Sequence, residues 1–337
     1  QLGVTCTASI GLTTLVYTCF DGHKTFTNSL ALNNTGVNTS KLNQLERFVK
    51  KFPKEGVHMS GEQLHNRLDE IEQIRGLYSP LQLGLAAAFA CAAFTFLLGG
   101  GPVEMLCAFI GAGIGNFLRC HLIKRHFTLY LCVISSVALA CLSYIASLRL
   151  MEAFLPISGN HEAGYICAML FIIPGFPFIT SGIDLAKLDM RSGLERLAYA
   201  VIIVVAATIT GWIMSSALGV HPANFADLSL HPMLHLVLRL AASFVGVFGF
   251  SIMFNSPAKI AAAAAVIGAV ANTFRLELAA LVDCPAAVAA FLGALTAGLL
   301  ASFLMKRLGY PRISVTVPSI VIMVPGLYLF RAVYNMG

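Results

Sequence analysis

The hydrophobic pattern divides the chain into two parts near residue 78. Before that point apolar positions are short and periodic, whereas after it they form long and almost uninterrupted runs. A membrane-spanning helix needs about 20 mostly apolar residues. The pattern therefore predicts an α-helical integral membrane protein that is preceded by a small soluble domain. We place nine visible transmembrane helices at about 81–99, 102–118, 128–149, 163–180, 194–219, 233–254, 257–274, 286–305 and 313–333.

The first part, residues 1–78, has the pattern of an α+β domain. From Gly3 to Ala31 the chain is rich in Thr, Val, Ile and Tyr and is interrupted by Asp21-Gly22, a typical turn pair. These features predict an antiparallel hairpin or a three-stranded sheet.

Two helices are expected after this sheet. Thr39 or Ser40 is suited to cap the first, which we expect to end before Pro53. Ser60 begins the second, and Gln63 completes its capping box.

Charge supports the same boundary. Charged residues make up only 11% of the chain, and 15 of the 38 precede Tyr78. The net charge is +6, but the basic residues lie singly at the ends of apolar runs and form no continuous stripe, so nucleic-acid binding is not expected.

The basic residues also predict an orientation. If the soluble domain is cytoplasmic, ten bases fall on the cytoplasmic connections, and they are Arg119, Lys124, Arg125, Lys187, Arg191, Arg196, Lys259, Lys306, Arg307 and Arg312. The opposite side has Arg149, Arg239, Arg275 and Arg331. The positive-inside rule therefore favours a cytoplasmic soluble domain.

Two motifs recur at nearly the same distance along the chain. Asn116-x-x-Arg119 returns as Asn272-x-x-Arg275 after 156 residues, and Pro174-Gly175 returns as Pro325-Gly326 after 151 residues. Five spans separate the equivalent positions, so the two copies should cross the membrane in opposite directions, as in many secondary transporters. We expect a first repeat over 79–220 and a second over 221–337.

The paired Pro-Gly breaks point to a central site. Pro removes a backbone hydrogen bond, and the freed groups are tolerated at membrane depth only where they face protein or a wet cavity. Glu104 lies just inside the second span and Asp184 just beyond the first Pro-Gly break, and ionisable groups near membrane depth are usually functional. The alternative for each acid is a position at the membrane interface, where it costs little.

No metal or cofactor site is expected. The nine cysteines are scattered without a CxxC pair and are interpreted as packing residues. The acidic residues Asp69, Glu70 and Glu72 alternate with bases and are interpreted as a solvated face. His231 and His235 are four residues apart but lack a third ligand.

One stretch resembles a known family. It reads Pro174-Gly175-Phe176-Pro177, then Gly182-Ile183-Asp184-Leu185, then Ser192-Gly193-Leu194-Glu195-Arg196. This pattern resembles that of the threonine/serine exporter (ThrE) family. The stretch from Phe96 to Arg119, the segment Arg67-Leu68-Asp69-Glu70-Ile71 and the stretch from Val317 to Gly326 are also similar to that family.

The resemblance implies ten helices in two inverted five-helix repeats, so we expect a chain that is trimmed at both ends and a second repeat without its last helix. It also implies export of threonine and serine across the inner (plasma) membrane, driven by the proton gradient. Some relatives in that family are split into two polypeptides and are linked to dicarboxylate export, which leaves succinate-type substrates as an alternative.

A transporter of this kind assigns roles to particular residues. Pro174, Gly175, Pro325 and Gly326 would flank the substrate, and Asp184 or Glu104 would carry the proton. Asn116 and Asn272 would hold the polar groups of the substrate, or would instead join neighbouring helices. Arg119, Arg275 and Arg196 are structural or gating candidates.

Other function classes are less well supported. A membrane-embedded enzyme would need a catalytic set, and the sequence has neither HExxH nor GxSxG. A sensor that uses the soluble domain and a passive channel are further alternatives. A homo-oligomer is compatible with the sequence but is not indicated by it.

Overall fold

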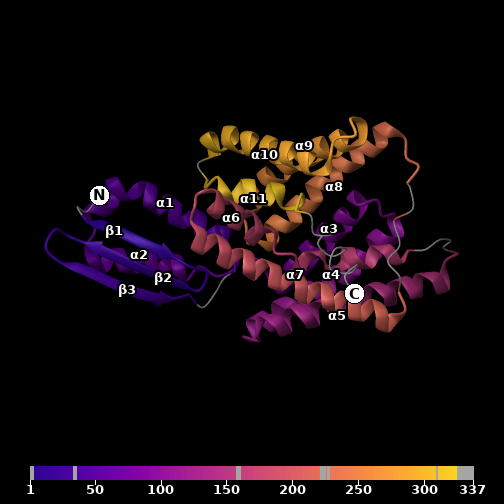
Figure 1. Ribbon diagram of the computed structural model, residues 1–337, viewed down its shortest axis with the longest axis horizontal. Helices are drawn as coiled ribbons and strands as arrows, with labels where there is room; N and C mark the ends of the chain where they lie inside the picture. The colour runs from indigo at the N-terminus through magenta and orange to yellow at the C-terminus, as the bar shows by residue number, and fades with distance from the viewer. Residues whose placement is uncertain are drawn as a thin grey trace.

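The computed structural model describes residues 4–32, 36–156, 161–220, 225, 228–308 and 310–324. A small domain with a sheet and two helices lies at one end of a larger helical bundle (Figure 1). The bundle contains all the long apolar helices. The first of these helices begins at Pro80.

The predicted sheet is present and has three antiparallel strands. They are β1 (Thr5–Ile10), β2 (Thr14–Phe20) and β3 (Thr25–Ala31), in the order β1-β2-β3. The predicted turn at Asp21 joins β2 to β3. The carboxylate of Asp21 accepts hydrogen bonds from the backbone N–H groups of Lys24 and His23, and these bonds hold the pKa of Asp21 below its usual value.

The register of the sheet separates two kinds of side chain. Ile10 lies opposite Leu15, and Leu15 lies opposite Leu30 on the other side. Because alternate residues of a strand point to opposite faces, one face is apolar and the other is rich in Thr and Ser. Cys6 lies opposite Cys19 on the apolar face.

The two helices of this domain are α1 (Thr39–Glu55) and α2 (Gly61–Glu72), with a short 3₁₀ turn, η1 (Gly56–His58), between them. The predicted capping box of α2 is confirmed. The prediction for α1 was wrong at both ends. Asn38 is its N-cap, and its side chain accepts from the N–H of Lys41. The helix continues through Pro53 and ends two residues later. Pro53 has no backbone N–H, so it removes one hydrogen bond from the last turn.

Seven helices are long and apolar enough to cross a membrane among the described residues. They are α3 (Pro80–Leu97), α4 (Pro102–Lys124), α5 (Leu129–Phe154), α7 (Met190–Leu218), α8 (Pro232–Met253), α9 (Ala258–Leu281) and α10 (Ala286–Leu308). A bent pair, η2 (Glu162–Ile172) and α6 (Gly175–Ala186), raises the count to eight if it forms one span. Multiple spans are thus confirmed.

The ninth predicted span, 313–333, is described only in part. The helix α11 covers Ile313–Val321. Pro325 and Gly326, with the second Pro-Gly break, lie outside the described residues.

The fourth predicted span, 163–180, is not one regular helix. Its first half, η2, is a 3₁₀ helix of 11 residues, and the chain then bends by 58° before α6, which continues to Ala186. Residues 163–172 are all buried. Runs of 3₁₀ helix longer than three or four residues are uncommon, and within a helix they often mark a hinge. The bend follows from Pro174, which has no N–H for a continuous helix.

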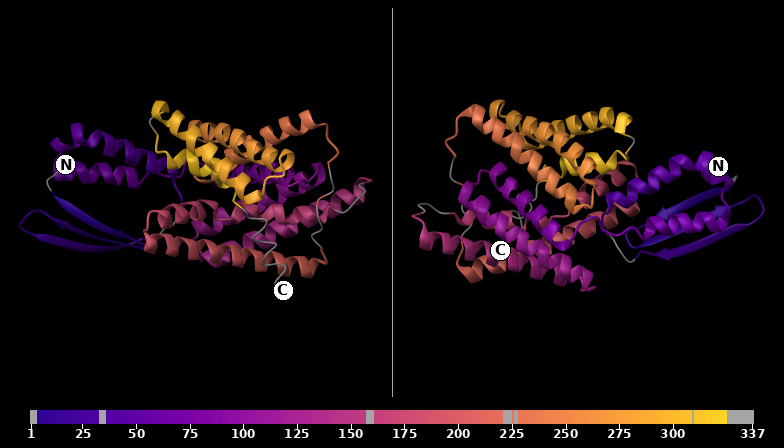
Figure 2. Two further views of the ribbon diagram at one scale, coloured as in Figure 1. Left: turned by 45° about the horizontal axis from the view of Figure 1, so that its top comes forward. Right: turned by 180° about the vertical axis from the view of Figure 1, so that it is seen from behind.

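The helices α3 and α8 pack against each other in opposite directions. The start of α3 lies near the end of α8, since the hydroxyl of Tyr78 donates to the carbonyl of Ser256 at 2.7 Å. The end of α3 lies near the segment before α8, since Gly99 and Gly100 approach Phe225. Figure 2 shows the two halves of the bundle on either side of this contact.

Small residues allow this close approach. A Cβ placed on Gly249 would lie 2.5 Å from the carbonyl oxygen of Ala86 and 2.9 Å from the Cβ of Ala90. In the reciprocal pair, a Cβ placed on Gly246 would lie 3.9 Å from the Cβ of Ala93. Gly246 lies 156 residues after Ala90, and Gly249 lies 156 residues after Ala93, which is the offset of the Asn motif. The Gly249–Ala90 contact and the Gly246–Ala93 contact therefore correspond to each other, as expected when two related segments pack symmetrically.

The ends of α3 and α8 have the same backbone geometry. Gly99 and Asn255 both have positive φ values, 103° and 59°. The N–H of each bonds the carbonyl three residues earlier at 2.9 Å. Gly99 and Asn255 are also 156 residues apart, as are Phe94 and Phe250, whose rings contact each other at 6.5 Å. The motif offset that the sequence shows is therefore matched by local structure.

The close contact between α3 and α8 predicts a specific stability effect. Gly249→Ala should destabilise the protein by about 1–3 kcal/mol, because backbone oxygen and a neighbouring methyl group leave no room for the added carbon. Thermal unfolding of the purified protein in detergent measures this. Gly298→Ala on α10 is the control, since no atom of the described residues lies within 4 Å of its added Cβ. Equal effects of the two changes would contradict the close packing.

Candidate functional site

The break between η2 and α6 is the centre of the candidate site. Pro174 is the N-cap of α6, and Gly175 is its first residue. A Cβ placed on Gly175 would lie 2.3 Å from a methyl group of Val321. Only glycine therefore fits here. The contact brings the first Pro-Gly break against the end of α11, four residues before Pro325.

The first turns of α6 are buried and carry small polar groups. Thr180 and Ser181 are buried, and the hydroxyl of Thr180 donates to the carbonyl of Phe176 at 3.0 Å. The ring of Phe176 contacts that of Phe254 at the end of α8. A half-helix that begins inside a membrane protein points the positive end of its dipole toward an anionic group of a substrate.

Glu104 is almost completely buried at the start of α4 and has two partners. One carboxylate oxygen accepts from the backbone N–H of Gly101 at 3.0 Å. The other lies 2.8 Å from Nδ1 of His161. The side chain of Glu104 is only 6% exposed, so this carboxylate depends on these contacts rather than on water.

Close packing fixes this pair from two sides. The hydroxyl of Tyr144 donates to the carbonyl of His161 at 2.7 Å. A Cβ on Gly164 would lie 2.3 Å from that hydroxyl and 2.8 Å from the Cβ of Glu104. The other ring nitrogen of His161 is buried with no hydrogen-bond partner in the described part of the chain. Packing therefore holds the imidazole of His161 within hydrogen-bond distance of the carboxylate.

Asp184 forms an ion pair with Arg196. The carboxylate of Asp184, near the end of α6, lies 3.0 Å from the guanidinium of Arg196 on α7. The two side chains are 20% and 31% exposed. The structure therefore brings together a predicted proton carrier and a predicted gating residue.

These two acidic sites lie toward opposite ends of the bundle. Glu104 follows the end of α3, which is the end far from the soluble domain. Asp184 and Arg196 lie near the soluble domain, because Glu195, which precedes Arg196, accepts from the backbone N–H of Leu12 at 2.6 Å.

Asn116 and Asn272 occupy similar places in their own helix pairs. The amide of Asn116 donates to the carbonyl of Leu83 on α3, and that of Asn272 donates to the hydroxyl of Ser243 on α8, both at 2.8 Å. Both side chains are buried, and the amide oxygen of each has no donor within the described residues. Each asparagine thus joins two helices and keeps one unused acceptor. Among the described residues, no hydrogen bond joins Asn116 to Asn272.

The remaining arginine candidates lie beyond these asparagines. Arg119 is partly buried on α4, and its Nε has no hydrogen-bond acceptor among the residues that the structure describes. Arg275 lies on α9, where its Cβ is 3.0 Å from a Cβ placed on Gly293 of α10.

Sequence reasoning missed His161 and the pair Arg239–Glu277. His161 is far from Glu104 in the chain and belongs to no motif. Arg239 on α8 contacts Glu277 on α9 at 2.8 Å, with both side chains mostly buried. A signal for the second pair was present, because a lone base and a lone acid occur within neighbouring apolar spans.

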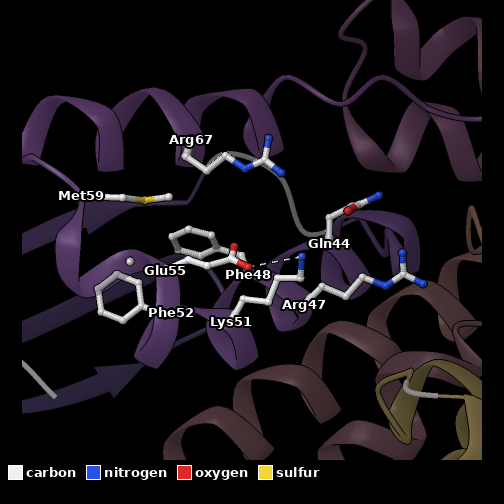
Figure 3. A pocket seen from close by; sticks show the side chains of 9 residues that line it. Gln44, Arg47, Phe48, Lys51, Phe52, Glu55, Met59 and Arg67 are labelled. Atoms are coloured by element: carbon white, nitrogen blue, oxygen red, sulfur yellow. Dashed lines mark ion pairs between the residues drawn. The ribbon is translucent and has the colours of Figure 1, made fainter.

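The soluble domain has a pocket of its own, with a volume of about 450 Å³ (Figure 3). Bases and aromatic rings of α1 line much of it, and Arg67 of α2 lies across from them. Arg47 of this pocket also lies 5.1 Å from the ring of Tyr310, beside α11. The lining residues are Gln44, Arg47, Phe48, Lys51, Phe52, Glu55, Gly56, Met59 and Arg67.

Two family descriptions match most of the chain. "Putative threonine/serine exporter" matches residues 1–219, and "Threonine/Serine exporter, ThrE" matches residues 239–337. Together they agree with the family that the motif from Pro174 to Arg196 resembles.

Individual relatives are distant. The chain is 24% identical over 211 residues to the probable succinate transporter subunit YjjP of Escherichia coli, which covers 62% of this chain and 78% of that protein. The protein of the same name from Klebsiella aerogenes is 24% identical over 205 residues, covering 60% and 75%. The pheromone-regulated membrane protein 10 of Debaryomyces hansenii is 24% identical over 204 residues, which is 54% of this chain but only 19% of that longer protein. No solved structure matches the chain.

The contact at the helix break can be tested by compensation. Gly175→Ala should lower the unfolding temperature, because the new methyl group meets Val321. Val321→Ala in the same protein should restore most of the loss, with a coupling energy of about 0.5–3 kcal/mol. Gly182→Ala, also on α6, should be nearly neutral, because in the part of the chain that the structure describes no atom lies within 4 Å of its added Cβ. If the effects of Gly175→Ala and Val321→Ala on the free energy of unfolding simply add in the double variant, the contact is absent.

Proposed function

The chain belongs to the threonine/serine exporter family, and from this premise we propose that it is a secondary transporter. It exports small polar metabolites, L-threonine and L-serine first among them, by proton-coupled alternating access. The observation that carries this proposal is the broken span, whose buried 3₁₀ half and short α6 meet at Pro174 beside the end of α11. Broken spans of this kind form the substrate sites of many secondary transporters.

The two halves are proposed to be inverted repeats. The antiparallel packing of α3 against α8 and the matching ends at Gly99 and Asn255 support this. On this plan 79–220 and 221–337 form the two repeats, and the break at Pro325-Gly326 is the partner of the one at Pro174-Gly175.

The soluble domain is proposed to face the cytoplasm, with the spans in the inner membrane. The excess of bases on the connections nearest that domain supports this orientation. Glu104 and His161 then lie toward the outer side, and Asp184 and Arg196 lie toward the cytoplasm.

Of the two acids, Glu104 is proposed as the proton carrier. Its partner is the imidazole of His161, whose ring nitrogens can donate or accept a hydrogen bond, and both groups are largely withdrawn from solvent. Asp184 faces a guanidinium, which stays charged at all physiological pH values. The Asp184–Arg196 pair is therefore better suited to a gate that forms and breaks on the cytoplasmic side.

The buried amide oxygens favour a substrate that carries an ammonium group. Asn116 and Asn272 each offer one acceptor without a donor, and a zwitterionic amino acid has N–H donors to give. A dicarboxylate has none. Succinate remains the second candidate, because two relatives carry the name of a probable succinate transporter subunit.

The proton role of Glu104 predicts a separation of two activities. In proteoliposomes, Glu104→Gln should keep the exchange of labelled for unlabelled threonine but should reduce gradient-driven uptake to the rate of empty vesicles. The amide retains the shape of the side chain and cannot carry the proton. Glu152→Gln, which alters a more exposed acid paired with Arg149, is the control and should keep both activities. Normal gradient-driven uptake by Glu104→Gln would remove Glu104 from the coupling mechanism.

The substrate is tested by competition in the same vesicles. Counterflow of labelled threonine through the full-length protein should be inhibited by serine and unaffected by succinate. Flux of succinate without threonine would assign the protein to dicarboxylate export, and the absence of both fluxes would contradict the transporter proposal.

A further inference from the structure

Two cysteines of the soluble domain face each other across neighbouring strands. Cys6 of β1 and Cys19 of β2 are register partners, and their sulfur atoms are 2.8 Å apart. Directly opposed residues in an antiparallel pair have Cβ atoms about 4.5–5.5 Å apart, within reach of a disulfide after a small adjustment. The scattered spacing of the cysteines along the chain did not indicate this pair.

Cys6 is the exposed member of this pair, whereas the cysteines of the bundle are buried or only partly exposed. Cys6 is exposed and Cys19 is partly exposed, whereas Cys91, Cys107 and Cys167 are buried between helices. The contact with Cys6 raises the pKa of the Cys19 thiol, so the more exposed Cys6 is the better placed to attack an oxidant.

We propose that Cys6 and Cys19 form a reversible redox site that a small disulfide oxidant, of the glutathione class, converts to an intramolecular disulfide. The thiolate of Cys6 attacks one sulfur of the oxidant and releases one thiol. The thiolate of Cys19 then attacks Cys6 in the mixed disulfide and releases the second thiol. The two cysteines lose two electrons and two protons in total, and the oxidant is reduced to two thiols.

The strands that carry the pair are fixed to the bundle. The backbone N–H of Leu12, in the turn between β1 and β2, donates to Glu195, and the hydroxyl of Thr14, the first residue of β2, accepts from Arg191 at 3.0 Å. Both partners lie at the start of α7, and Glu195 precedes the gating residue Arg196.

The same domain is fixed to the other half of the bundle. The N–H of Thr39, at the start of α1, donates to the carbonyl of Phe254 at 3.1 Å, and the side chain of Asn255 donates to that of Asn38 at 2.8 Å. The soluble domain thus connects α7 to the junction of α8 and α9. A disulfide that stiffens β1 and β2 strengthens this connection, and transport slows because α7 packs against α6 of the broken span, which must move during transport.

Formation of the disulfide does not rest on the proposed function, whereas the slower transport does. The first experiment therefore uses the purified full-length protein and oxidised glutathione, followed by mass spectrometry of its peptides. The expected product is a Cys6–Cys19 disulfide that dithiothreitol removes. In Cys19→Ser the reaction should stop at glutathione bound to Cys6. Cys284→Ser, which alters a partly exposed cysteine elsewhere, is the control and should behave like the parent protein.

The second experiment measures threonine counterflow before and after the same oxidation. The rate should fall roughly fivefold, the lower end of typical allosteric effects, and should recover with dithiothreitol. Cys19→Ser should lose this response. If oxidised glutathione modifies Cys6 but never joins it to Cys19, the redox site is refuted. If the disulfide forms and an active transporter keeps its rate, the regulatory step is refuted. If the reduced protein shows no threonine counterflow, the proposed function is contradicted, but formation of the disulfide is not.

Discussion

The close antiparallel contact between α3 and α8 is the constraint on which the rest of the bundle depends. Lipid offers no hydrophobic driving force for helix association, so neighbouring spans are held by packing and by buried hydrogen bonds. Gly249 lets the backbone of α8 approach that of α3, and the reciprocal Gly246–Ala93 contact extends the fit along the helices. Each of the two helices then holds its own partner through a buried asparagine, Asn116 for α4 and Asn272 for α9. The two halves therefore share one rigid centre.

The soluble domain adds a second connection between the halves, outside the membrane-spanning region. Its strand turn contacts Glu195 on α7, and its first helix contacts the α8–α9 junction at Asn255. Asn255 adopts a positive φ and uses both ends of its side-chain amide, donating to Asn38 and accepting from Leu77. The equivalent glycine, Gly99, has no side chain and lies at the far end of α3. Of these two similar helix endings, the one at Asn255 contacts the soluble domain.

The sequence predicted the parts of the structure that depend on periodicity and on local chemistry. Long apolar runs located the helices from α3 to α10, and Ser60 with Gln63 marked the start of α2. The sequence also placed a break at Pro174, but it could not show the buried 3₁₀ helix before it, because a continuous apolar run fits either geometry. His161 was missed for a different reason. Its contact with Glu104 joins residues far apart in the chain, and only the packing of Tyr144 and Gly164 brings them together.

A rigid centre limits how such a bundle can change shape. Packed interfaces tend to switch between discrete arrangements rather than deform continuously, so the α3–α8 contact is a poor place for a large movement. The span formed by η2 and α6 differs, since its hydrogen-bond ladder is already interrupted at Pro174 and its first half has the weaker 3₁₀ pattern. Movement there would separate Gly175 from Val321 at one end of α6 and would strain the Asp184–Arg196 pair at the other. Because His161 directly precedes η2, the same movement would also act on the Glu104–His161 contact and would couple it to the break at Pro174.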